Sequence, residues 1–268
     1  MLKVFKYLFI LIVSIYIIIC IALYFFQEKL IFVPQKLPAD FAFSFEKAHE
    51  EIFVALKDGN HLNGILFRAD SSKGLVFYLH GNAGALNSWG NAADTYLSMH
   101  YDFFVMDYRG YGKSEGEISS EQQVHEDIQA AYNLMLKKYN EDEIIIAGYS
   151  IGTGPAAYLA SINKPKMLIL QAPYYNLTEL ALSQYPFIPS FLLRYKFETS
   201  SLLPNVKSPV VIFHGDQDNL ITIDHAYKLK KLFKPGDQLI VLDSLGHNGM
   251  NDNLLYKQKL GSILSYLK

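Results

Sequence analysis

The sequence predicts an α/β fold: a mostly parallel central sheet with helices on both faces, a short helical cap and an N-terminal transmembrane helix. Two observations predict it. Short, nearly continuous apolar runs alternate with helical segments along most of the chain, which is typical of a parallel sheet covered on both sides. A run of 20 uncharged residues, 7–26, precedes them. As a helix this run is about 30 Å long, the thickness of the hydrocarbon core of a bilayer.

The N-terminal segment, residues 1–28, is expected to be an uncleaved membrane anchor for a single domain, residues 29–268. Its apolar run is longer than that of a cleaved signal peptide and ends in aromatic residues. Lys3 and Lys6 precede the run, and Lys29 follows it. The positive-inside rule therefore predicts a cytoplasmic N-terminus, with the domain on the opposite, extracytoplasmic side.

The first strands are expected to form a hairpin. In "EIFVALKDGNHLNGILFRAD" (51–70), two apolar stretches flank the turn-forming tripeptide "DGN". Further strands are expected in the apolar runs that follow: 74–80, 102–108, 143–150, 166–172, 209–215 and 238–244. Their length and continuity fit strands that are buried on both faces.

Helices are expected between most of these strands and at the end of the chain. The clearest is 119–139, for which Ser119 is a candidate N-cap. Residues 174–205 interrupt the strand–helix alternation, because they are rich in aromatic residues and leucine and contain three prolines. This composition favours a small helical cap over the alternative of one long crossover helix.

The pentapeptide "GYSIG" (148–152) places Ser150 between a predicted strand and a predicted helix. It fits G-x-S-x-G, in which a sharp turn pushes the serine hydroxyl out above the sheet. The glycines on either side leave room for close backbone approach, and the following helix N-terminus favours developing negative charge. Ser150 is therefore a candidate nucleophile.

A serine nucleophile needs a base, and the base needs an orienting carboxylate. Asp218 and His247 follow Ser150 in the expected chain order, each just after a predicted strand. Asp216 is a rival carboxylate, but its position directly after a glycine suits a turn better. Asp243 is a weaker rival because it lies inside or at the end of its strand. The histidines of the two His-Gly pairs, His80 and His214, are interpreted as structural.

The sequence also contains a candidate oxyanion hole. "HGNAG" (80–84) follows a predicted strand. The backbone N–H of Asn82 and that of Ile151, the residue after the nucleophile, can together donate to an oxyanion. "GKS" in "YGKSEG" (111–116) is not a phosphate-binding loop, because Asp107 stands where that motif needs its first glycine.

Together these motifs resemble the α/β-hydrolase superfamily, over the chain from about residue 50 to its end. "HGNAG", "DYRGYGKSEG", "GYSIG", "YPFIPSFLLRYKF" and "HGDQDNLI" are similar to a membrane-anchored branch described as serine-aminopeptidase-like or lysophospholipase-like. The resemblance implies a Ser–His–Asp triad, no metal and no organic cofactor. It leaves the substrate open, since members of the superfamily cleave esters, thioesters or amides.

These features predict a membrane-anchored serine hydrolase that acts on a small-molecule, lipid-like or acyl substrate. Two alternatives stay open. A peptidase that removes N-terminal residues would need a carboxylate for the substrate amine, and Glu179 and Glu198 are the candidates; a catalytically silent interaction protein is the other. A net charge of −2 argues against a nucleic-acid partner, and the lone cysteine, Cys20, excludes an intrachain disulfide or a cysteine-based zinc site.

Overall fold

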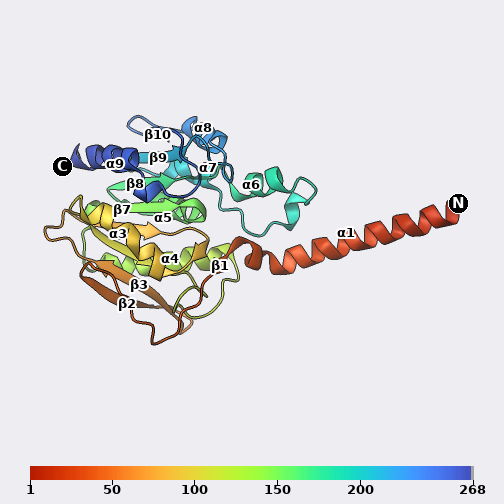
Figure 1. The fold of residues 1–268 in the computed structure, drawn as a ribbon, viewed down its shortest axis with the longest axis horizontal. Coiled ribbons are helices and arrows are strands. Elements are labelled where there is room, and N and C mark those ends of the chain that lie inside the picture. Colours follow the sequence, from red (N-terminus) through yellow and green to blue (C-terminus); the bar gives the residue numbers. More distant parts are fainter. Residues whose placement is uncertain (267–268) are drawn as a thin grey trace.

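The structure, a computed structural model, describes residues 1–266. Within them, the predicted apolar runs and the hairpin form the strands of one eight-stranded sheet. In chain order these are β2 (His49–Ala55), β3 (His61–Phe67), β4 (Leu75–Leu79), β6 (Asp102–Met106), β7 (Ile144–Tyr149), β8 (Met167–Gln171), β9 (Val210–Gly215) and β10 (Gln238–Leu242). Their order across the sheet is β10-β9-β8-β7-β4-β6-β3-β2 (Figure 1).

The strands from β10 to β6 run parallel, whereas β3 runs antiparallel to both of its neighbours, β6 and β2. In the hairpin, Ala55 pairs with His61, so residues 56–60 form the loop around the predicted "DGN" turn. The predicted mostly parallel sheet and the predicted hairpin are both confirmed. A second, two-stranded sheet pairs β1 (Val33–Pro34) with β5 (Ala83–Gly84).

Helices cover both faces of the large sheet, because successive strand residues point to opposite sides. One face packs against α4 (Glu121–Met135), α5 (Thr153–Ile162) and α8 (Asp224–Lys230). The other packs against α3 (Ala93–Leu97) and α9 (Leu254–Tyr266), and α2 (Leu86–Trp89) lies at its edge. On that second face the Tyr96 and Tyr256 hydroxyls lie 2.9 Å apart, which ties α3 to α9.

The N-cap of α4 differs from the prediction by one residue. Ser120, not Ser119, has the extended backbone of an N-cap, and its hydroxyl accepts a hydrogen bond from the Gln123 N–H at 3.1 Å. Ser119 instead donates its own N–H to the Gln123 side chain at 2.8 Å. The sequence could not separate two adjacent serines, because the backbone dihedral angles decide which one caps the helix.

The predicted cap is present but is only partly helical. It contains α6 (Leu177–Gln184), a 3₁₀ turn at Ser190–Leu192 and α7 (Thr199–Leu202). Two of its prolines, Pro186 and Pro189, lie in the irregular segment between α6 and the 3₁₀ turn. Proline lacks the N–H that a continuous helix would need there.

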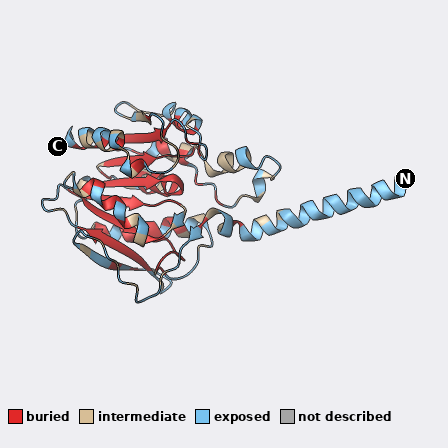
Figure 2. Ribbon diagram, in the orientation of Figure 1, coloured by how far each residue is buried: buried red, intermediate tan, exposed pale blue. Residues whose placement is uncertain are grey.

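The helix α1 (Leu2–Ile31) projects from the body as a rod, and the body end of the rod lies beside the cap (Figure 1). Most of its surface is exposed (Figure 2). Of the helices in residues 1–266, α1 is the one long and apolar enough to cross a membrane, a property that a signal sequence can share. The helix continues past residue 28 because its last turn, from Gln27 onward, packs on the body; Gln27 is 5% exposed.

A buried ion pair fastens the loop after β6 to α4. The Arg109 guanidinium donates through Nε and Nη2 to both oxygens of Asp127, at 2.6 and 2.9 Å. Both residues are buried, so removing the carboxylate would leave a buried cation without its bidentate partner.

We predict that Asp127→Ala lowers the stability by about 3–5 kcal/mol. For a domain of this size that is roughly 6–20 °C in melting temperature, measurable by thermal unfolding in detergent. Asp58→Ala is the control, because Asp58 also contacts Arg109 but its side chain is 46% exposed. An equal or larger shift for Asp58→Ala would contradict the assignment of Asp127 as the structural partner.

Candidate active site

Ser150 lies on a strained turn between β7 and α5. Its φ is 53°, in the left-handed region that non-glycine residues rarely occupy. The turn is packed closely: a Cβ on Gly152 would collide with the Leu79 carbonyl of β4, and one on Gly148 would collide with the Gly152 carbonyl. These contacts explain why glycine occupies both positions and why the serine side chain is held above the sheet.

The structure brings Ser150, His247 and Asp218 into one line of hydrogen bonds. The distance from Ser150 Oγ to His247 Nε2 is 2.9 Å, and from His247 Nδ1 to Asp218 Oδ2 it is 2.7 Å. Since a carboxylate only accepts, Nδ1 carries the imidazole proton and Nε2 is free to accept the serine proton. The line can therefore move a proton from the serine hydroxyl to the imidazole.

Asp218 is buried and fully engaged. Its Oδ1 accepts the backbone N–H groups of Leu220 and Ile221 at 2.9 and 2.8 Å. Burial alone would raise the pKa of Asp218, but the nearby His214 ring and the hydrogen bonds from His247 and the Ile221 N–H outweigh burial and hold this pKa well below its usual range. The carboxyl group therefore stays ionised wherever His247 can act as a base.

The rival acids lie elsewhere. Asp216 and Asp243 are both exposed, and His247 donates its Nδ1–H to Asp218 instead. Of the histidines interpreted as structural, His214 donates Nε2–H to the Ile221 carbonyl at 2.7 Å and lies 3.4 Å from Asp218 Oδ2. His214 thus supports the loop that carries the acid.

The two predicted oxyanion residues border the same cavity as Ser150. The Asn82 side chain is engaged by α1, since Nδ2 donates to the Ile31 carbonyl at 3.3 Å. The neighbouring His80 is buried and donates Nδ1–H to the Gly81 carbonyl at 2.7 Å, so it supports this loop. A backbone role for Asn82 in an oxyanion hole stays a prediction.

The cavity above Ser150 has a volume of about 720 Å³, in the range of small-molecule sites. Its walls come from the cap, from α1 and from the loops after β4, β7 and β9. Four of its lining residues are polar: Gln27, Asn82, Ser150 and Gln184. The rest are apolar or aromatic, so the site suits a substrate with a long apolar part.

Tyr149 has a role that the sequence did not reveal. Its hydroxyl donates to the His247 carbonyl, which fastens the histidine loop to the end of β7. Burial raises the pKa of Tyr149, so its hydroxyl keeps the proton that it donates. The only sequence signal was its position beside the nucleophile.

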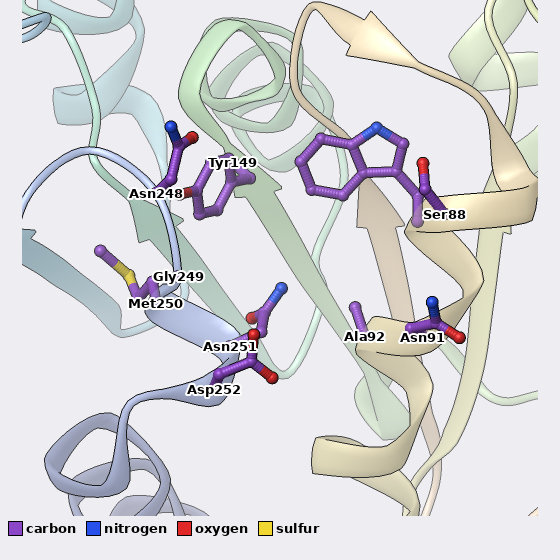
Figure 3. A pocket seen from close by; sticks show the side chains of 10 residues that line it. Ser88, Asn91, Ala92, Tyr149, Asn248, Gly249, Met250, Asn251 and Asp252 are labelled. Atoms are coloured by element: carbon purple, nitrogen blue, oxygen red, sulfur yellow. The ribbon is translucent and has the colours of Figure 1, made fainter.

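A smaller, more polar pocket of about 270 Å³ borders the histidine loop. Figure 3 shows Tyr149 beside Asn248 on one side of this pocket and Ser88 and Asn91 on the other. Ser150 does not line it. Among residues 1–266, no group of three or more His, Cys, Asp or Glu side chains is arranged to hold a metal ion.

Comparisons with known proteins agree with this fold. A family model described as the α/β hydrolase fold matches residues 74–197. An uncharacterised protein of Mycobacterium tuberculosis is 29% identical over 227 residues, which cover 83% of this chain and 80% of the relative. The α/β hydrolase domain-containing protein 17C of Mus musculus is 28% identical over 226 residues, which cover 82% of this chain and 68% of that protein.

Solved structures share the fold at low sequence identity. An esterase of Pyrococcus furiosus superposes with a TM-score of 0.72 at 17% identity, over 88% of this chain and 97% of the esterase. The chain has the α/β-hydrolase fold, and the matched family model and relatives support the resemblance to the α/β-hydrolase superfamily that its motifs predicted. Its coarse functional class is that of a hydrolase.

We predict that Asp218→Asn slows covalent labelling of Ser150 by a fluorophosphonate by up to roughly 10⁴-fold, the loss caused by the same change in a serine protease. An amide at this position can donate to Nδ1 and so favours the wrong imidazole tautomer. Asp216→Asn is the matched control and should label at the wild-type rate, as followed by gel fluorescence. The assignment is wrong if the control variant loses labelling and Asp218→Asn keeps it.

Proposed function

We propose that the protein is a membrane-anchored serine hydrolase that cleaves a carboxylic ester or thioester of a lipid-like acyl substrate. One observation carries the proposal: the Ser150–His247–Asp218 line ends at a cavity of about 720 Å³ whose walls are largely apolar. The hydrogen-bonded line supplies an activated nucleophile, and the cavity supplies a place for an acyl chain.

In the proposed reaction, Ser150 Oγ attacks the substrate carbonyl carbon while His247 Nε2 takes the hydroxyl proton. The backbone N–H groups of Asn82 and Ile151 stabilise the oxyanion that forms. The bond to the leaving group then breaks, and His247 gives its proton to the departing alcohol or thiol. Water attacks the acyl-enzyme with His247 again as base, which releases the carboxylic acid and restores Ser150.

Asp218 does not exchange protons in this scheme. It stays ionised, holds the tautomer of His247 and stabilises the imidazolium that forms transiently. The two backbone N–H groups bound to Oδ1 hold this carboxylate in one orientation. A rigid, ionised acid of this kind is what the base needs in order to act in both half-reactions.

The peptidase alternative receives less support. It needs a carboxylate in the cavity for the substrate amine, and the lining residues, all in the described part of the chain, include neither Glu179 nor Glu198. Glu179 instead pairs with Lys228 at 2.6 Å, and Glu198 is exposed. The alternative of a catalytically silent interaction protein does not explain the strained turn at Ser150. It also does not explain the complete line of hydrogen bonds from Ser150 through His247 to Asp218.

We predict that Ser150→Ala abolishes fluorophosphonate labelling and lowers ester turnover by roughly 10⁶-fold, because the nucleophile is lost. The wild-type protein should hydrolyse p-nitrophenyl esters with kcat/KM rising from acetate to octanoate, since each buried CH₂ contributes about 0.8 kcal/mol. Aminoacyl anilides are the comparison substrates. A preference for the anilides, or a profile that falls steeply after acetate, would favour the peptidase.

The anchor is proposed to leave the N-terminus in the cytoplasm and the domain outside, from the lysines that flank the apolar run. Protease added to intact spheroplasts should then digest the domain, as followed by immunoblotting against a C-terminal tag. A cytoplasmic marker protein should stay intact in the same sample. If the domain is protected until the cells are lysed, the proposed orientation is wrong and the domain lies in the cytoplasm.

A further inference from the structure

The helix α1 contributes a wall to the cavity above Ser150. Ile19, Leu23, Gln27 and Leu30 all line it. Spacings of three and four residues place them on one face of the helix, so they form a continuous stripe. The proposed anchor therefore has a second role: part of its apolar surface faces the substrate.

The body end of α1 is fastened to both the cap and the oxyanion loop. Gln27 donates through Nε2 to the Leu192 carbonyl at 3.2 Å, and its Oε1 accepts the Arg194 N–H at 2.8 Å. Glu28 accepts the Tyr195 hydroxyl at 2.9 Å. These polar contacts, together with the one from Asn82 to the end of the helix, hold the stripe in register with the site.

The contact between α1 and the cap also extends toward the N-terminus. The Tyr16 hydroxyl donates to the Phe187 carbonyl at 2.8 Å. Tyr16 lies near the middle of the apolar run 7–26, and at 1.5 Å per residue it is about 15 Å from the run's last residue. If the run spans the hydrocarbon core, the tip of the cap reaches into the same leaflet.

The cap tip, residues 185–191, has the surface expected of a segment that meets lipid. Tyr185, Phe187 and Phe191 are 59%, 84% and 82% exposed, which is unusual for large aromatic groups in contact with water. Phe187 lies at the cavity wall, whereas Phe191 is not among the lining residues. An exposed aromatic cluster beside a membrane-spanning helix suits the lipid interface.

The backbone of the cap tip is also suited to a place with little water, where unpaired polar groups are costly. Pro186 and Pro189 have no N–H to satisfy. The Tyr185 N–H donates to the Ala181 carbonyl at 2.8 Å, and the Ile188 N–H donates to the Tyr185 carbonyl at 3.1 Å. The Phe187 carbonyl accepts the hydrogen bond from the Tyr16 hydroxyl, so a residue of the anchor helix pairs one of the polar backbone groups of the cap tip.

We propose that the cap tip enters one leaflet beside α1 and that the cavity opens toward the hydrocarbon between them. The acyl chain of a membrane lipid ester then reaches Ser150 sideways from the bilayer, along the stripe of α1, without crossing water. This inference rests on the proposed hydrolase function and adds to it the source of the substrate and its route.

The first test places a larger side chain on the face of α1 that lines the cavity. Leu23→Trp, in the full chain in phosphatidylcholine nanodiscs, is compared with Ile21→Trp; Ile21 is 53% exposed and does not line the cavity. The readout is the ratio of kcat/KM for p-nitrophenyl laurate to that for the butyrate. Leu23→Trp should lower this ratio roughly 15-fold, the loss of about two CH₂ sites at about fourfold each. Ile21→Trp should leave the ratio at the wild-type value.

Two outcomes of this test would overturn the inference: an unchanged ratio in Leu23→Trp, or an equal fall in both variants. Failure of the underlying function looks different. In that case the wild-type protein hydrolyses neither ester and Ser150 is not labelled by the fluorophosphonate. The position of the cap tip is then still decided by a measurement that needs no turnover.

That measurement places an environment-sensitive fluorophore on the cap tip. In a Cys20→Ala background, Phe187→Cys and, as a control, Phe53→Cys are labelled and reconstituted with phosphatidylcholine that carries a doxyl quencher on its acyl chain. Phe53 is 52% exposed and lies on β2, on the body away from α1 (Figure 1). Strong quenching at 187 but not at 53 is expected. Equal and weak quenching at both positions would show that the tip stays in water.

Discussion

The left-handed turn at Ser150 is the constraint on which the rest of the site depends. For a non-glycine residue, holding this backbone conformation costs about 1–3 kcal/mol of conformational free energy. The turn persists because the elements around it leave no alternative: Gly152 lies against the end of β4, and Gly148 lies against Gly152 itself. The same close packing points the serine hydroxyl away from the sheet, toward the loops that carry its partners.

Those loops meet above Ser150 because parallel strands end at one edge of the sheet. Asp218 follows β9 and His247 follows β10, two strands that lie side by side. Each loop is then fixed by contacts of its own: backbone N–H groups and His214 for the acid, and the Tyr149 hydroxyl for the histidine. Because these supports are largely buried, they hold the hydrogen-bonded line without depending on solvent.

The N-terminal helix is part of this construction rather than an appendage. The strand β1 follows α1 directly and pairs with β5, so Val33 lies opposite Ala83 in the loop after β4. The Asn82 carbonyl accepts both the Val33 N–H and the Tyr111 hydroxyl, at 2.9 and 2.7 Å. The helix α1, the loop after β4 and the cap thus share hydrogen bonds, so a change in the position of α1 would alter the walls of the cavity above Ser150.

The sequence by itself determined the elements of the fold and the residue types of the site. Apolar runs, turn residues and the chain order of Ser150, Asp218 and His247 are local patterns, and each of them constrains the backbone over a few residues. The hairpin and the parallel strands follow from such patterns. The same holds for the presence of a long N-terminal apolar helix, although packing on the body decides where it ends.

Only the tertiary structure decided what depends on direction and distance. Asp216 and Asp218 both follow β9, and the path of the loop puts one in solvent and the other on His247. Ser120 rather than Ser119 caps α4 because of the backbone angles at one residue. Leu23 and Ser150 border one cavity although they are far apart in the chain, because α1 packs against the cap and the loop after β4. No local pattern records a contact between segments so distant in sequence.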